Sequence, residues 1–158
     1  MSATATPRVE RGLLLRNMGP QSNLATLREC AALAEQAGID HLWVVDHIAI
    51  PPDDAEGSGG RYLDPLGTLA FLAGATTRIG LGVTVLIAPY RPKLPTAKLI
   101  ATVQELSAGR LQLGVGVGWM EAEFRALGVP RGARGRLTDE FLAFLHECFA
   151  HDVVEAHG

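Results

Sequence analysis

The chain alternates between short apolar runs and longer segments with helical spacing of apolar residues, and this alternation repeats four times. The short runs are rich in leucine, isoleucine and valine and are bounded by glycine, proline or polar residues, as strands usually are. Strands that alternate with helices of about ten to fifteen residues predict a parallel sheet with right-handed crossovers. The predicted strands cover residues 12–17, 39–45, 79–87 and 111–117.

The segments between these strands carry the signals that begin and end helices. Asn23 is a suitable N-cap for a first helix, and Gly38 lies where a helix commonly ends. Asp64 and Pro65 begin a second helix, because aspartate caps free N–H groups and proline fits the first turn. Further helices are expected over residues 95–106, 121–127 and 136–149, and a polar loop over residues 51–62.

Two architectures fit four such units: an open doubly wound sheet, or part of a (β/α)₈ barrel. The periodicity of the sequence does not distinguish between them. In both architectures, ligands bind at the carboxyl ends of the strands. The residues placed there are Asn17, Asp46 with His47, the segment 84–90, and Gly118 with Trp119.

Composition narrows the class of protein. The chain has 158 residues, 47% of them apolar and 20% charged, which is typical of a globular domain. Its net charge of −3 gives no reason to expect nucleic acid or an acidic membrane surface as a partner. Cys30 and Cys148 lie far apart, which argues against a disulfide framework or a zinc site. We expect a cytoplasmic protein without a metal or a membrane span, with a flexible tail at 1–10 and one domain at 11–158.

Glycine occupies every second position of the fourth predicted strand, at Gly114, Gly116 and Gly118. Gly80 and Gly82 repeat this pattern in the third strand, so one face of the sheet is bare backbone there. Such a face permits close approach by a flat ligand, or close packing by a helix or by large side chains. The Gly-x-Gly-x-Gly spacing differs from the Gly-x-Gly-x-x-Gly fingerprint, and we reject a dinucleotide-binding Rossmann fold.

Candidate chemistry lies mainly at Asp46 and His47. Histidine can accept or donate a proton near neutral pH, and an adjacent carboxylate raises its basicity or orients the loop. The alternative is that Asp46 caps a turn and His47 bonds to backbone. Trp119 is suited to stacking on a planar ring or to packing in the core. Glu121 is interpreted as a carboxylate at a helix N-terminus, and Glu123 as that or as an ion-pair partner of a nearby arginine.

Several sequence blocks resemble the luciferase-like monooxygenase superfamily, especially its members that use the deazaflavin coenzyme F420. Each block is short, but their order and spacing together are specific and extend from Leu13 to Phe149. The blocks are residues 34–38 leading into 42–47, 76–82, 97–98 before 106–111, 114–119, 123–124, 127–130, 134 and 139–140.

This resemblance implies the N-terminal half of a (β/α)₈ TIM barrel, with four parallel strands and outer helices. It implies a flavin- or deazaflavin-dependent oxidoreductase or monooxygenase that transfers hydride at the C-terminal face of the strands and acts on a small molecule. The implied cofactor is F420, with FMN as the alternative. His47 matches the histidine that contacts the cofactor or serves as acid or base in deazaflavin members, and Asp46 beside it is the second predicted catalytic residue. A non-prolyl cis peptide is expected behind the cofactor ring, at Val83–Val85. The residues implied to contact the cofactor are Val83, Thr84, Val85, Gly116, Gly118 and Trp119.

The length of the chain departs from the resemblance. A complete barrel of this type needs about 250 residues, whereas the chain has 158. The second hypothesis is therefore a truncated half-barrel that is catalytically inactive and only binds or associates. Half a barrel leaves strand edges open, so we expect it to form homo-oligomers or to aggregate.

Overall fold

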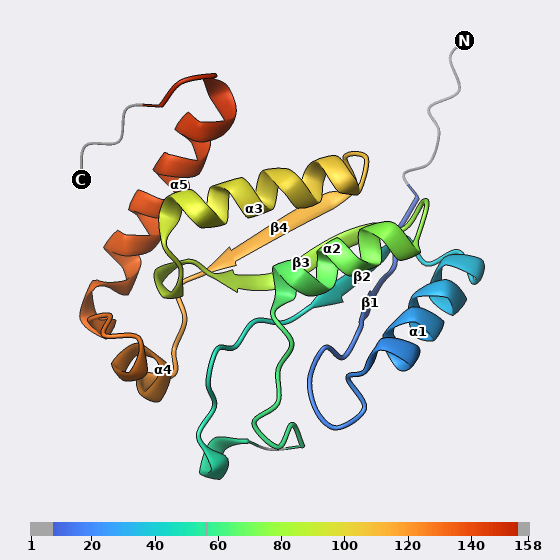
Figure 1. The fold of residues 1–158 in the computed structure, drawn as a ribbon, viewed down its shortest axis with the longest axis horizontal. Coiled ribbons are helices and arrows are strands. Elements are labelled where there is room, and N and C mark those ends of the chain that lie inside the picture. The colour runs from blue at the N-terminus through green and yellow to red at the C-terminus, as the bar shows by residue number, and fades with distance from the viewer. Residues whose placement is uncertain (1–7, 56, 155–158) are drawn as a thin grey trace.

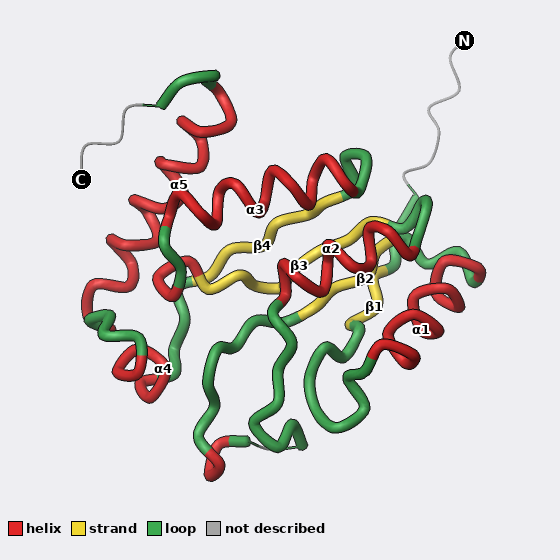
Figure 2. The backbone as a smooth tube through the Cα atoms, in the orientation of Figure 1, coloured by secondary structure: helices red, strands yellow, loops and turns green. Residues whose placement is uncertain are grey.

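The computed structural model describes residues 8–55 and 57–154 as an α/β fold with one parallel sheet (Figures 1 and 2). The strands follow one another in chain order and pair in parallel, which confirms the topology predicted from the sequence. They are β1 (Gly12–Leu14), β2 (His41–Val44), β3 (Gly80–Ile87) and β4 (Leu111–Gly116). The helices are α1 (Leu24–Gln36), α2 (Pro65–Ala75), α3 (Lys93–Leu106), α4 (Glu121–Ala126) and α5 (Arg134–Ala150), with 3₁₀ turns η1 (Pro52–Asp54), η2 (Ala88–Tyr90) and η3 (Arg131–Ala133).

The helices begin where the sequence places their caps. The side chain of Asn23 accepts a hydrogen bond from the N–H of Thr26, and that of Asp64 accepts one from Gly67. Helix α3 begins at Lys93, two residues earlier than expected, and Pro95 lies in its first turn, where proline removes no helical hydrogen bond. Strand β1 ends after Leu14, well short of the predicted residue 17.

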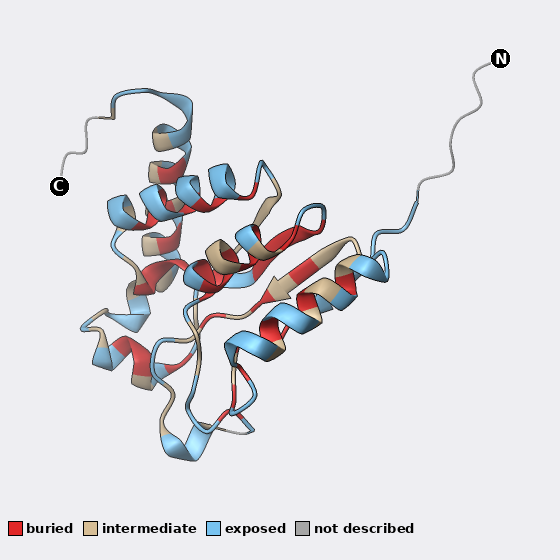
Figure 3. Ribbon diagram, turned by 45° about the vertical axis from the view of Figure 1, so that its right-hand side comes forward, coloured by how far each residue is buried: buried red, intermediate tan, exposed pale blue. Residues whose placement is uncertain are grey.

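The hydrophobic core lies between the sheet and helices α1, α2 and α3, and α5 adds Phe141 and Leu145 to it (Figure 3). Strand residues alternate between two faces, and the core takes one set of them, including Leu42 and Val44 of β2. The helices contribute the residues that meet this face, which are Leu27, Ala31, Leu66, Leu69, Leu72, Ala97, Ile100 and Val103. The other face of the sheet, here called the inner face, points away from these helices.

Large side chains fill the space above the glycines of the inner face. A Cβ atom at Gly82 would collide with the ring of Trp43, and one at Gly12 would lie 2.6 Å from Nε1 of that ring. A Cβ atom at Gly116 would meet the side chain of Val85. Of the two explanations for the bare strand faces, close packing by large side chains is therefore correct at these positions.

Strands β1 and β4 each pair with only one neighbour in the sheet. The side chains of Leu13 and Leu14 are consequently exposed, and every residue of β4 is only partly buried. Of the expected tail, residues 1–7 lie outside the described residues, while Arg8 pairs with Asp40. Within residues 8–55 and 57–154, no helix is both long and apolar enough to cross a membrane.

Candidate active site

Asn17 joins the ends of the first two strands at the carboxyl edge of the sheet. Its side chain is buried, and Nδ2 donates to the carbonyl oxygens of Val45 and Leu63, both at 2.8 Å. Its Oδ1 accepts a hydrogen bond of 3.0 Å from the N–H of Val45. These side-chain bonds replace a strand ladder, which explains why β1 is shorter than predicted, and they fix the backbone just before Asp46.

Asp46 follows β2 and has a fully buried carboxylate. Its Oδ1 lies 2.7 Å from Nη2 of Arg91, and its Oδ2 accepts a hydrogen bond of 2.9 Å from the N–H of Ile87. Arg91 also pairs with Asp64, the cap of α2, at 2.9 Å. Burial lowers the pKa of Arg91, but its bonds to Asp46 and Asp64 outweigh this and raise the pKa overall. The Asp46 carboxylate thus joins β2 to the end of β3, and its charged partner is Arg91.

His47 lies beside Trp119 at the same edge, with a ring that is 16% exposed. The ring of Trp119 stands nearly perpendicular to the His47 ring, and their centroids are 6.2 Å apart. The ring of Tyr62 also contacts the His47 ring, with the two centroids 5.0 Å apart. Nδ1 of His47 lies 2.9 Å from Oε2 of Glu123. Among residues 8–55 and 57–154, no group forms a hydrogen bond with Nε2, which leaves this nitrogen for a ligand.

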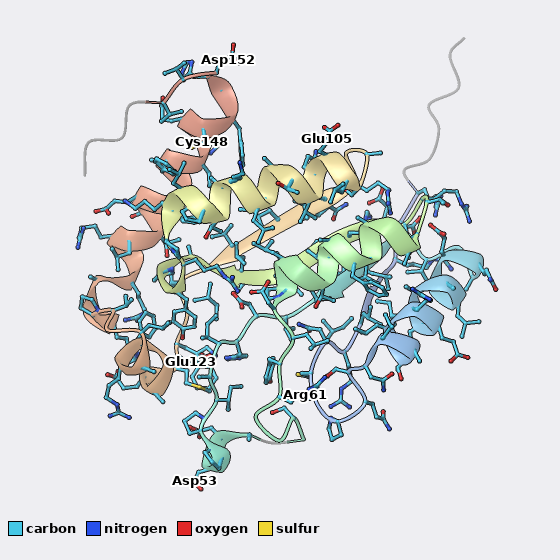
Figure 4. All side chains as sticks on the ribbon, viewed as in Figure 1. Asp53, Arg61, Glu105, Glu123, Cys148 and Asp152 are labelled. Atoms are coloured by element: carbon cyan, nitrogen blue, oxygen red, sulfur yellow. The ribbon has the colours of Figure 1, made fainter. Side chains whose placement is uncertain are left out.

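Glu123 comes from α4 and has a completely buried side chain (Figure 4). Besides His47, its carboxylate binds the N–H groups of Ile48 at 2.5 Å and Ala49 at 3.0 Å. The hydroxyl of Tyr90 donates a fourth hydrogen bond at 3.1 Å. Burial raises the pKa of Glu123, but the hydrogen bonds from His47, Ala49 and Ile48 outweigh it, so the pKa lies below its usual value.

The interpretation of Glu123 as a helix-end carboxylate or the partner of an arginine misses its main role. Its partner His47 lies 76 positions earlier in the chain, and no local spacing rule connects the two. The arginines instead pair with exposed carboxylates: Arg131 with Glu121, and Arg136 with Glu140. The pattern of residues around Glu123 gives no sign of this contact, since an apolar neighbour such as Phe124 says nothing of the direction in which the glutamate points.

The residues expected to contact a cofactor differ in whether their side chains are exposed or buried. The side chain of Val83 is wholly buried in the core, so only its backbone is available. The Thr84–Val85 peptide bond is cis, at the place that the resemblance implies, and both residues are exposed. Gly116 lies beneath Val85, and Gly118 has a φ of +74° and packs against Ile87 and Phe124.

Trp119 is the most exposed aromatic residue at this edge, with 63% of its surface accessible. Its carbonyl oxygen accepts a hydrogen bond of 3.1 Å from Nε of Arg131, which also pairs with Glu121. Val85, on β3, is a second apolar side chain that is exposed, with 39% of its surface accessible. In the described part of the chain, no three histidine, cysteine, aspartate or glutamate side chains gather as metal ligands would.

Comparison with known protein families adds a match that covers nearly the whole chain. The model of the luciferase-like monooxygenase family matches residues 10–158. The chain belongs to the luciferase-like monooxygenase family.

Relatives of this luciferase-like chain include proteins that use different cofactors. It is 36% identical over 124 residues to an uncharacterized protein of Mycobacterium tuberculosis, covering 71% of the chain and 44% of that protein. It is 27% identical over 157 residues to the FMNH(2)-dependent dimethylsulfone monooxygenase of Pseudomonas putida, covering 96% of the chain and 42% of the enzyme. The luciferase-like chain spans less than half the length of either relative.

A solved structure confirms the barrel-type fold. An F420-dependent secondary alcohol dehydrogenase, in complex with an F420–acetone adduct, superimposes on the luciferase-like chain with a TM-score of 0.80 at 21% identity. The match covers 96% of this chain and 46% of the dehydrogenase. The expectation of half a TIM barrel, with four parallel strands and outer helices, is therefore confirmed.

The exposed groups at the carboxyl edge fit the ring of a flavin or deazaflavin. Such a ring is planar and largely apolar, with polar atoms at its rim. The exposed side chains of Trp119 and Val85 are apolar, and the ring of His47, which lies beside that of Trp119, carries a polar atom. The edge thus combines a surface for the ring with a group that can hold or move a proton.

Proposed function

We propose that this chain forms half of the active site of a flavin- or deazaflavin-dependent oxidoreductase or monooxygenase. In this proposal the ring of F420, or alternatively FMN, lies against Val85 and Trp119, with the backbone of residues 83–84 beside it. Gly116 and Gly118 support this surface from below, because they pack against Val85, Ile87 and Phe124. The bound cofactor would supply hydride transfer, and the substrate is a small molecule. The observation that carries the proposal is the exposed ring of Trp119 beside the ring of His47, whose Nε2 forms no hydrogen bond with any of the described residues.

His47 is the catalytic residue of this proposal, because its Nε2 is the polar atom that can reach a ligand at the edge. Its part is to accept or donate a proton at that nitrogen. Asp46 acts by positioning, since its buried carboxylate holds the N–H of Ile87 and the side chain of Arg91. Asp46 and Glu123 thereby fix the backbone on both sides of His47.

The alternative, a half-barrel that is inactive by itself, applies to the isolated chain. The chain spans less than half of its relatives, so the ring would have a wall on one side only. We therefore propose that the isolated chain binds FMN or F420 weakly and that a complete barrel is needed for turnover. We also propose that the isolated chain self-associates, because the edges of β1 and β4 are open. The free thiols of Cys30 and Cys148 support a cytoplasmic location.

The proposal is tested by titrating the isolated chain with FMN or F420 and following its two indole N–H signals by NMR. The Trp119 signal is expected to shift with a dissociation constant of about 1 mM or weaker, because half of the ring's contacts are missing. The Trp43 signal is the internal control, since its ring packs on the glycines of the inner face. A titration that leaves Trp119 unchanged up to the solubility of both cofactors contradicts the proposal.

A further inference from the structure

Glu123 has every acceptor position of its carboxylate occupied. Oε1 accepts the N–H groups of Ile48 and Ala49, and Oε2 faces Nδ1 of His47 and the hydroxyl of Tyr90. An ionised carboxylate has about four lone-pair sites, two on each oxygen. The four contacts fill these sites, and the side chain is shielded from solvent.

The partners of Glu123 show which atoms carry protons. Backbone N–H groups can only donate, so Oε1 must be an acceptor towards Ile48 and Ala49. If the Glu123 carboxyl group were protonated, its hydrogen would point at one of the N–H or O–H groups that already donate to it. Hydrogen bonding keeps the pKa of Glu123 low, so the group is an anion at neutral pH. The hydrogen between Glu123 and His47 therefore belongs to Nδ1.

We propose that Glu123 is a positioning residue that holds His47 in the tautomer protonated at Nδ1, so that the neutral ring presents an unprotonated Nε2. The group facing Nε2 in the neutral state is then a hydrogen-bond donor of the cofactor or substrate. This last step rests on the function proposed above, whereas the tautomer of His47 does not. Glu123 acts through His47 and does not itself touch the ligand.

The arrangement allows a proton to move at Nε2 without rearranging the rest of the site. When a donor group gives its proton to Nε2, the bond between that proton and the donor breaks and an N–H bond forms on the ring. The Nδ1–H bond to Glu123 persists in the resulting imidazolium, and the reverse transfer restores the neutral ring. Tyr62 and Tyr90 are the other titratable groups near this pair, and Asp46 is engaged with Arg91.

The tautomer is measured directly by NMR of the full chain labelled with ¹⁵N in histidine, at a pH where the ring is neutral. The ring ¹⁵N signals that disappear in a His47→Gln variant are those of His47. In the unmodified chain, Nδ1 is expected to have the ¹⁵N chemical shift of a protonated ring nitrogen, and Nε2 that of an unprotonated one.

Glu123→Gln is expected to reverse this pattern. The introduced amide must keep its oxygen towards Ile48 and Ala49, because those N–H groups can only donate. Its NH₂ group then faces His47, whose Nδ1 must accept, and the proton moves to Nε2. The matched control is Tyr90→Phe, which removes one donor from the same carboxylate oxygen and should leave the proton on Nδ1.

Two results would overturn the proposal: a proton on Nε2 in the unmodified chain, or an unchanged tautomer in a folded Glu123→Gln variant. If the Glu123→Gln variant does not fold, the unmodified and Tyr90→Phe spectra still decide, because both must show the proton on Nδ1. Failure of the proposed function is visible separately, as a Trp119 indole signal that does not respond to FMN or F420.

Discussion

At each of the two edges of the sheet, a glutamate carboxylate accepts hydrogen bonds from several backbone N–H groups, but the other partners of the two carboxylates differ. At the amino edge, Glu35 at the end of α1 accepts hydrogen bonds from the N–H groups of Thr77, Arg78 and Ile79, just before β3. At the carboxyl edge, Glu123 accepts two backbone N–H groups and also binds His47 and Tyr90.

The difference lies in burial and in the nature of the donors. Glu35 is only partly buried, and all of its partners are groups of one turn that do not titrate near neutral pH. Glu123 is fully buried and holds an imidazole whose other nitrogen is available. A buried or partly buried glutamate thus closes a turn at one edge and orients an imidazole at the other. The proposed role of His47 would follow the general pattern of (β/α)₈ barrels, in which catalysis lies at the C-terminal face and stability at the opposite face.

The largest effect is expected for Glu123→Ala. Removal of the carboxylate leaves four donors without their acceptor, and the free energy of unfolding should fall by about 3–5 kcal/mol. Urea denaturation followed by circular dichroism measures this change. The matched control is Glu121→Ala, two residues earlier on the same helix, where an exposed pair with Arg131 should contribute less than about 1 kcal/mol. Similar losses in both variants would contradict the larger contribution assigned to the buried carboxylate.

A smaller, pH-dependent effect is expected for Glu35→Gln. Burial raises the pKa of Glu35, but the N–H groups of Arg78, Ile79 and Thr77 lower it to about 2 from a usual value of 4.5. Since the folded pKa is the lower one, the charge stabilises the fold above about pH 4.5, and this contribution disappears as the pH falls towards about 2. The variant should be less stable by about 1–2 kcal/mol at pH 7, after allowance for solvent screening.

The measurement is a comparison of urea midpoints for Glu35→Gln and the unmodified chain between pH 7 and pH 3, a range of about four pH units. The gap between the two midpoints should stay constant at first and then narrow below about pH 4.5. A gap that widens on acidification would show that the Glu35 carboxylate does not act through its charge.

The smallest effect is expected for Glu140→Gln on α5. Its exposed carboxylate pairs with Lys93 and Arg136, and the hydrogen bond from Lys93 does most to lower its pKa. Exposed pairs of this kind are screened by salt and contribute little. The urea midpoint should be indistinguishable from that of the unmodified chain at high salt. A change in urea midpoint as large as that of Glu35→Gln would show that the exposure of a carboxylate does not determine how much it stabilises the fold.

Local patterns in the sequence predict most of the fold, because its elements are set by neighbouring residues. Asn23 and Asp64 cap helices as their side-chain chemistry dictates, and apolar periodicity places β3 to within one residue. The end of β1 is not predictable in this way, because it depends on Asn17 bonding to Val45.

The candidate site is less predictable, since its contacts join residues from different strand–helix units. The sequence directs attention to His47 and Trp119 because both follow strands, and the structure places their rings side by side. It gives no sign that Arg91 neutralises Asp46, or that Glu123 is the carboxylate that meets His47. Both pairings depend on the parallel pairing of β2, β3 and β4, which brings the carboxyl ends of these strands to one edge of the sheet.

The most direct test of the account is a crystal structure of the chain grown with FMN or F420. It should show the cofactor ring against Val85 and Trp119, with a polar rim atom within hydrogen-bond distance of Nε2 of His47. Glu123 should remain bonded to Nδ1 of the same ring and to the N–H groups of Ile48 and Ala49. A ring bound in the apolar hollow beside β1 and α1 that includes Leu13 and Cys30, or a His47 turned away from Glu123, would contradict the account.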